Sequence, residues 1–112
     1  MENYEKIIER FLDASIKYGE AIEVGDSKKA TKQSSIIRKI RQQLTISCEL
    51  QLLIPSIKHD NDYVKLNVAS SLMTILPNDS REVLQELQKK KGLIGFEAGM
   101  FLQEWERGNV KL

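Results

Sequence analysis

The sequence predicts an all-α protein of about six helices, arranged as three antiparallel hairpins that stack into an α-solenoid. Apolar residues recur at three- and four-residue spacing along most of the 112 residues, which is typical of helices that bury one face. Asparagine, aspartate and glycine interrupt this pattern where caps and turns are expected. Hairpins spanning about residues 3–47, 48–77 and 78–108 make about the smallest stacked array that buries a continuous core.

The stretch from residue 52 to residue 76 predicts two helices joined by a polar turn. Asn61 and Asp62 are residue types that cap a helix, because their side chains accept hydrogen bonds from its first N–H groups. The helix that follows, from about Tyr63 to Leu76, carries two apolar stripes. The first is formed by Val64, Val68, Leu72 and Ile75, and the second by Leu66, Ala69, Met73 and Leu76. Two stripes predict a helix covered on both sides.

The first hairpin is predicted from a helix that runs from Tyr4 to about Val24. Gly19 lies on its apolar face, which suggests the close approach of a neighbouring helix. Gly25 is placed to end this helix. Asp26 or Ser27 caps the second helix, which is expected to extend to about residue 47.

The second hairpin begins near Cys48, and Pro55 is expected to kink or divide its first helix. Pro77 is expected to stop the following helix at Leu76. Asp79 with Glu82 three residues later predicts a capping box for the fifth helix.

The third hairpin is expected to place three lysines, residues 89–91, at the C-terminal end of the fifth helix, before a glycine stop at Gly92. Residues 92–95 predict a short apolar hinge, and a last helix follows from about Phe96 to Arg107 with Trp105 inward. Residues 109–112 are expected to fray. The spacing Ala-x-x-Leu-Met at residues 69–73 is similar to Ala-x-x-Phe-Leu at residues 98–102, which suggests an internal repeat with close helix packing at both alanines.

Composition bounds the class of protein. The 17 basic and 16 acidic residues leave a net charge of +1, so no global field favours nucleic acid or an anionic membrane. The apolar runs are too short to span a bilayer, and the acidic, amphipathic N-terminus is unlike a signal peptide. A single cysteine fits a reducing compartment, so a cytoplasmic location is expected.

Residues that carry chemistry are sparse. One histidine (His59) and one cysteine (Cys48) cannot make a tetrahedral metal site, and His59 is expected in the turn and Cys48 in inert packing. No glycine-rich phosphate loop opens a strand-to-helix turn. We therefore expect no catalytic residue, no metal and no cofactor, and a protein that is not an enzyme.

Charge is distributed unevenly between the first two helices. Residues 1–26 hold seven acidic and three basic residues, whereas residues 27–47 hold six basic residues and no acidic one. The six are Lys28, Lys29, Lys32, Arg38, Lys39 and Arg41. Two readings remain open: solvated faces that neutralise each other in part across the hairpin, or a basic binding surface.

The central stretch resembles a HEAT repeat. The resemblance is carried by Leu53-Ile54-Pro55, Asp60, Val64-Lys65, Ala69 and Leu72, with lysine at residue 65 where arginine is commoner. The whole chain is similar to a bacterial family of HEAT-like single-domain proteins of unknown function, through residues 25–29, residues 92–98 and Glu104-Trp105-x-x-Gly108. This resemblance implies a HEAT-like fold and an immunity protein that binds and neutralises a cognate toxin.

We expect a non-enzymatic module that binds a protein partner. The hypothesis places the binding surface on the basic face of the second helix together with the exposed edge of the fourth. Its residues are Lys28, Lys32, Lys39, Asp62, Lys65 and Asn67. The alternative is a nucleic-acid-binding HEAT-like domain in which Lys28, Lys32 and Lys39 contact phosphates. The sequence leaves the oligomeric state open.

Overall fold

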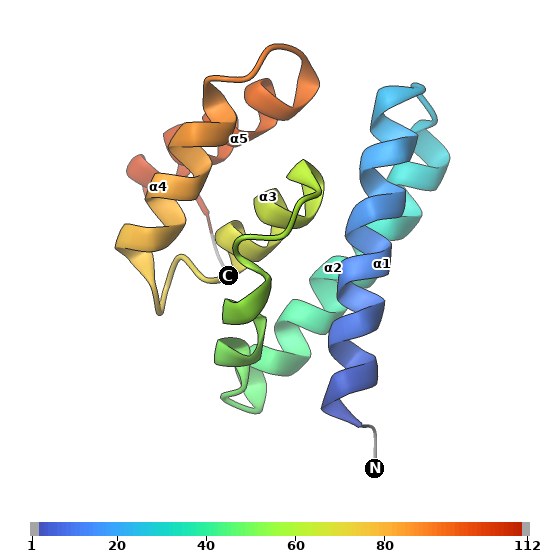
Figure 1. The fold of residues 1–112 in the computed structure, drawn as a ribbon, viewed down its shortest axis with the longest axis vertical. Helices are drawn as coiled ribbons and strands as arrows, with labels where there is room; N and C mark the ends of the chain where they lie inside the picture. The colour runs from blue at the N-terminus through green and yellow to red at the C-terminus, as the bar shows by residue number, and fades with distance from the viewer. Residues whose placement is uncertain (1–2, 111–112) are drawn as a thin grey trace.

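The computed structural model describes residues 3–110, and within that range it contains six helices and no strand. In chain order they are α1 (Tyr4–Glu23), α2 (Ser27–Ile46), the 3₁₀ helix η1 (Leu50–Ser56), α3 (Asp62–Ser71), α4 (Pro77–Gln88) and α5 (Leu93–Glu106). The prediction of an all-helical protein is confirmed. Figure 1 shows α1 and α2 side by side at one side of the molecule, α4 and α5 at the other, and α3 between them.

The central helix α3 is covered on both sides, as its two apolar stripes predict. One stripe lies in a core shared with α1, α2 and η1, and the other in a second core formed with α4 and α5. The first stripe consists of Val64, Val68 and Leu72, and the second of Leu66, Ala69 and Met73. Ala98 of α5 is fully buried in the second core with Ala69, so small residues do lie where these helices meet.

The N-terminal helix α1 packs along α2 and also touches α3. Phe11 of α1 and Leu44 of α2 are fully buried in the first core. Gly19 lies against the side chain of Tyr63, where an added Cβ would overlap the tyrosine ring. The close approach predicted at Gly19 is therefore confirmed, and the neighbour is α3. Gly25 ends α1 with a φ of 74°.

The boundary between α3 and α4 differs from the prediction. α3 ends at Ser71 instead of Leu76, and Pro77 is the first residue of α4 rather than a stop. Proline suits this position because the N–H that it lacks would have no partner in the first turn. Asp79 consequently lies inside the first turn of α4, so the predicted capping box is wrong: the residue at the cap is Leu76, which makes no side-chain cap bond.

The segment expected to be the third helix is a 3₁₀ helix with Pro55 inside it. Tighter 3₁₀ turns are used in short pieces, and proline interrupts the backbone bonding of a longer helix. Cys48, just before it, has a φ of 58° and is exposed. The expectation that this thiol is packed inside the protein is wrong, because Cys48 takes the left-handed position that follows the end of α2.

The last helix begins earlier than expected. Gly92, with a φ of 91°, ends the turn, and Leu93 opens α5, so the hinge predicted for residues 92–95 is mostly helical. Near the other end of α5, Asn109 is held by its N–H bond to the Glu104 carbonyl at 2.9 Å and by its side chain on the Glu104 carboxylate at 2.8 Å. The fraying expected there is therefore wrong for Asn109, and residues 111 and 112 lie outside the described range.

The described chain has a radius of gyration of 13.2 Å. A compact chain of this length is expected at about 13 Å, so the six helices form a globule and not an elongated rod. In the described part of the chain, no helix combines the length and the apolarity that crossing a bilayer requires.

Candidate functional site

The three predicted lysines of α2 lie on the outer face of that helix. Lys28, Lys32 and Lys39 are all exposed, and at 3.6 residues per turn they fall within about 40° of one another around the helix axis. Ile46 lies on the same line at the end of α2 and is 84% exposed. The structure thus brings the three lysines together as one row, which we call the α2 lysine row (Lys28, Lys32 and Lys39).

The basic residues of α2 form no direct ion pair with the acids of α1 in the described part of the chain. Among the described residues, none of the six basic side chains of α2 takes part in an ion pair. Within α1, an ion pair joins the Lys17 ammonium to the Asp13 carboxylate at 3.0 Å. Of the two interpretations of the charge asymmetry, the first involves partial neutralisation across the hairpin. Direct ion pairing between α1 and α2 does not provide that neutralisation in this part of the chain.

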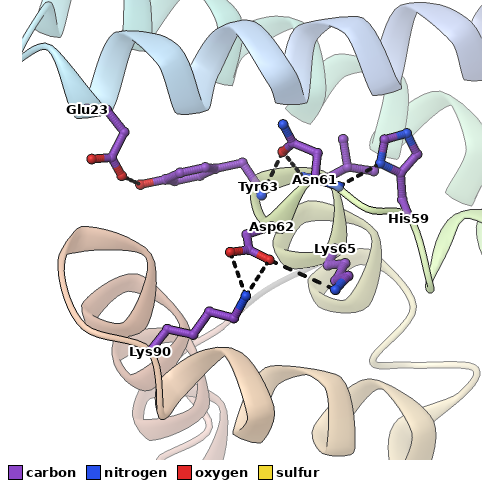
Figure 2. A network of polar contacts seen from close by, with 8 residues as sticks. Glu23, His59, Asn61, Asp62, Tyr63, Lys65 and Lys90 are labelled. Carbon is purple, nitrogen blue, oxygen red and sulfur yellow. Dashed lines mark hydrogen bonds and ion pairs between the residues drawn. The ribbon is translucent and has the colours of Figure 1, made fainter.

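Asp62 and Lys65 lie together at the N-terminal end of α3 (Figure 2). Lys90, from the turn between α4 and α5, places its ammonium 2.9 Å from Asp62 Oδ2, and Lys65 lies 3.9 Å from Oδ1. Asp62 therefore ties the start of α3 to the end of α4. The three lysines at residues 89–91 were expected to serve the C-terminal end of their own helix, whereas Lys90 bonds across to α3.

The turn that leads into α3 is built as the sequence predicts. Asn61 is the cap, and its side-chain oxygen accepts the N–H groups of Tyr63 at 2.9 Å and Val64 at 3.1 Å. His59 accepts the N–H of Asn61 through Nδ1 at 3.0 Å, so it is a turn residue (Figure 2). These bonds account for His59 and Asn61 without a ligand.

Asn67 points to a different part of the surface. It lines a hollow with Arg41 of α2 and Glu97 of α5, whereas Lys65 lines a groove beside α4. The six predicted residues therefore occupy three places: the α2 lysine row, the Asp62–Lys65 pair and the hollow at Asn67. The structure does not bring Asn67 into the same hollow as Lys65, and the binding role of all six stays a prediction.

The groove beside α4 is a feature that the sequence analysis missed. It has a volume of about 540 Å³, and Ile57, Val83 and Leu87 supply its apolar surface. Three acidic residues of α4 and three lysines complete the lining: Asp79, Glu82, Glu86, Lys58, Lys65 and Lys90. The acids recur at three- and four-residue spacing, which places them on one face of α4 and would have been the signal to read.

A cluster of tyrosines and glutamates joins α1, α3 and α5. Tyr63 donates its hydroxyl to Glu23 at 2.7 Å (Figure 2), and Tyr18 donates to Glu97 at 2.7 Å. The two rings meet edge to face with centroids 6.0 Å apart. Burial, followed by the hydrogen bond to the neighbouring carboxylate, raises the pKa of both tyrosines above its ordinary value. Both phenols therefore act as hydrogen-bond donors that lock the three helices together.

The carboxyl group of Glu97 is half-buried between α1 and α5. Burial raises its pKa, the hydrogen bond from Tyr18 opposes that shift, and the nearby charge of Glu23 adds to it. Among the described residues, no cluster of histidine, cysteine and carboxylate side chains has the composition to hold a metal ion. The partly buried Trp105 stacks on Phe101 with ring centroids 6.2 Å apart, so it packs against the second core.

The fold defined by these helices recurs in a solved structure. No protein-family model matches the sequence, and no curated protein matches it either. The crystal structure of the protein RPA1889 from Rhodopseudomonas palustris CGA009 is similar to this chain with a TM-score of 0.89, at 17% sequence identity. The match covers 100% of this chain and 95% of that one. At this identity the likeness shows a shared fold and nothing about function.

Proposed function

We propose that this protein is a non-enzymatic module that binds an acidic surface of a partner protein through the α2 lysine row. The observation that carries the proposal is that Lys28, Lys32 and Lys39 are exposed and have no ion pair among the described residues. Unpaired surface cations remain available to a partner and steer its approach. Single exposed pairs contribute little, so the row acts through the combined charge of several lysines.

The exposed Ile46 favours a protein partner over nucleic acid. It lies on the same side of α2 as Lys28, 18 residues further along, which is about 27 Å on a straight helix. A protein interface combines charged groups with apolar contacts that exclude water. A phosphate backbone offers no equivalent apolar contact to an isoleucine at the end of a row of lysines.

The finer arrangement is also part of the proposal. We place the six helices in a HEAT-like array of three hairpins: α1 with α2, η1 with α3, and α4 with α5. Support comes from the contacts within each of these pairs and from α3, whose opposite faces take part in both cores. A cytoplasmic immunity protein that neutralises a toxin is the concrete form of the function, and it rests on the sequence resemblance.

The test uses two purified variants with the same change of charge. In the first, Lys28, Lys32 and Lys39 are all replaced by glutamate. In the second, the matched control, exposed lysines at residues 6, 58 and 91, which have no ion pair within the described range, are replaced by glutamate instead. The partner is captured from nuclease-treated lysate with the tagged protein, identified by mass spectrometry and purified for affinity measurements.

In the first variant, several ion pairs with the partner, worth about 0.5 kcal/mol each, turn from attractive to repulsive. Reversal of the α2 lysine row is therefore expected to weaken binding by about 30-fold or more. The control is expected to change affinity by less than about threefold. Full affinity after reversal of the α2 lysine row would rule out the proposed surface. Capture that disappears with nuclease, together with binding to nucleic acid that weakens steeply with salt, would replace it with the nucleic-acid function.

A further inference from the structure

A small hollow where α2, α3 and α5 meet contains two side-chain charges without a counter-charge. Its volume is about 290 Å³, and its lining includes Arg41, Asn67, Ser70, Glu97 and Phe101. This is just below the range of about 300–1,000 Å³ typical of pockets for drug-sized ligands. Arg41 and Glu97 both line the hollow, yet they form no ion pair with each other.

Arg41 is fixed in place but has no anion. Its Nε donates to Ser71 Oγ at 2.8 Å, and Ser71 in turn donates to the carbonyl of Asn67 at 2.7 Å. Burial, and to a smaller extent the charge of Arg38, lowers the pKa of the guanidinium. A cation removed from water without a carboxylate is unfavourable. The terminal nitrogens of Arg41 therefore remain available for a bidentate anion such as a carboxylate.

On the other wall of the hollow, Glu97 has no cation. One of its carboxylate oxygens, Oε1, accepts the Tyr18 hydroxyl at 2.7 Å, which leaves Oε2 available. Asn67 uses its amide nitrogen on the Tyr63 carbonyl at 3.0 Å, so its side-chain oxygen can still accept a hydrogen bond. The Ser70 hydroxyl donates to the Leu66 carbonyl at 2.6 Å and likewise keeps its acceptor capacity. These three acceptors match the three N–H donors of a primary ammonium group.

We propose that this hollow binds a free α-amino acid. The ligand's carboxylate pairs with Arg41, and its ammonium group donates to Glu97, Asn67 and Ser70. A ligand with a single charge leaves either Arg41 or Glu97 without a counter-charge, whereas a zwitterion compensates both. Leu66 and Phe101 supply the apolar wall for the ligand's side chain. This site lies apart from the α2 lysine row, so it does not depend on the proposed partner binding.

The experiment measures the binding of the standard α-amino acids, each at about 10 mM, by thermal unfolding, and then titrates any ligand that raises Tm by calorimetry. At a concentration about ten times Kd, Tm is expected to rise by several degrees. The matching N-acetyl amino acid, which lacks the ammonium group, and the matching primary amine, which lacks the carboxylate, are expected to bind at least about tenfold more weakly.

Four variants locate the site. Arg41→Gln and Glu97→Gln are each expected to weaken binding by more than about tenfold. Glutamine at residue 97 still accepts the Tyr18 bond, so that variant is expected to fold. Lys29→Gln and Glu82→Gln remove exposed charges outside the hollow and are expected to leave Kd unchanged. Circular dichroism and the unliganded Tm of each variant separate loss of binding from loss of folding.

Three results would overturn the proposal. The first is that no α-amino acid raises Tm or gives a binding heat. The second is that the N-acetyl derivative or the amine binds as tightly as the free amino acid, which would make the hollow a site for one charge only. The third is that Lys29→Gln or Glu82→Gln lowers affinity as much as the variants within the hollow.

Discussion

Ser80 provides the sharpest test of the energetics of this fold. It is 0% exposed in α4, and its hydroxyl oxygen has no hydrogen-bond partner among the described residues. A buried polar group without a partner costs about 1–3 kcal/mol. Alanine removes this cost, and it is also the better helix former by about 0.5 kcal/mol. Ser80→Ala is therefore expected to stabilise the protein by about 1–2 kcal/mol, which corresponds to a rise in Tm of about 5–10 °C.

Ser15 offers a matched control. It is also 0% exposed and lies inside a helix, but its hydroxyl donates to the Phe11 carbonyl at 2.9 Å. Ser15→Ala loses that bond, worth about 1 kcal/mol, and gains the same helix propensity, so its net effect is expected near zero or slightly destabilising. Urea unfolding of the two variants measures the difference. Equal effects of Ser80→Ala and Ser15→Ala, or a destabilising Ser80→Ala, would refute the reasoning.

Four further substitutions test packing, backbone conformation and ionisation. Gly19→Ala forces the Tyr63 side chain to move and is expected to lower the free energy of unfolding, measured in urea, by about 1–2 kcal/mol. In the control Gly99→Ala, the nearest neighbour of the added methyl group is the end of a flexible side chain, and the free energy of unfolding is expected to rise by up to about 1 kcal/mol. A stabilising Gly19→Ala would contradict the close approach. Cys48→Gly removes a left-handed non-glycine residue and is expected to raise stability by about 1 kcal/mol, and an unchanged Tm would argue against strain there. Because the folded-state pKa of Glu97 is raised, folding favours its protonated form, and this contribution is present at low pH and is lost as pH rises through the raised pKa. The stability of Glu97→Gln relative to the natural protein is therefore expected to increase from acidic to neutral pH, and a constant difference would contradict the raised pKa.

The parts of the fold that the sequence predicts are those determined by local chemistry. The two stripes of α3 follow from helical periodicity, and both are buried in separate cores. Asn61 and Asp26 cap their helices because an oxygen on a short side chain reaches the first N–H groups from that position. Gly25 follows the end of α1 at positive φ for an equally local reason. Gly92 does not end the fifth helix as expected, because α4 already ends at Gln88 and Gly92 is the N-cap of α5.

The parts that the sequence does not predict depend on tertiary structure or on a choice between two local roles. Pro77 is compatible both with ending one helix and with starting the next, and only the backbone geometry decides. Cys48 occupies a left-handed position that local propensity assigns to glycine or asparagine.

The candidate sites are harder still to predict. The bond between Tyr18 and Glu97 joins residues 79 positions apart, and no periodicity signals such a pair. The hollow at Arg41 likewise exists only because three helices converge. The lysines of α2 were visible in the sequence, but their lack of ion pairs was not.

The double role of α3 has a consequence for how the chain unfolds. This helix has ten residues, fewer than the roughly 12–15 at which an isolated helix becomes stable in water. Because α3 contributes to both cores, neither core remains complete when the other opens, and α3 retains its structure only while both persist. The two sides of the molecule are therefore expected to unfold in one cooperative transition, with the α3 amides exchanging their hydrogens only when the whole chain opens.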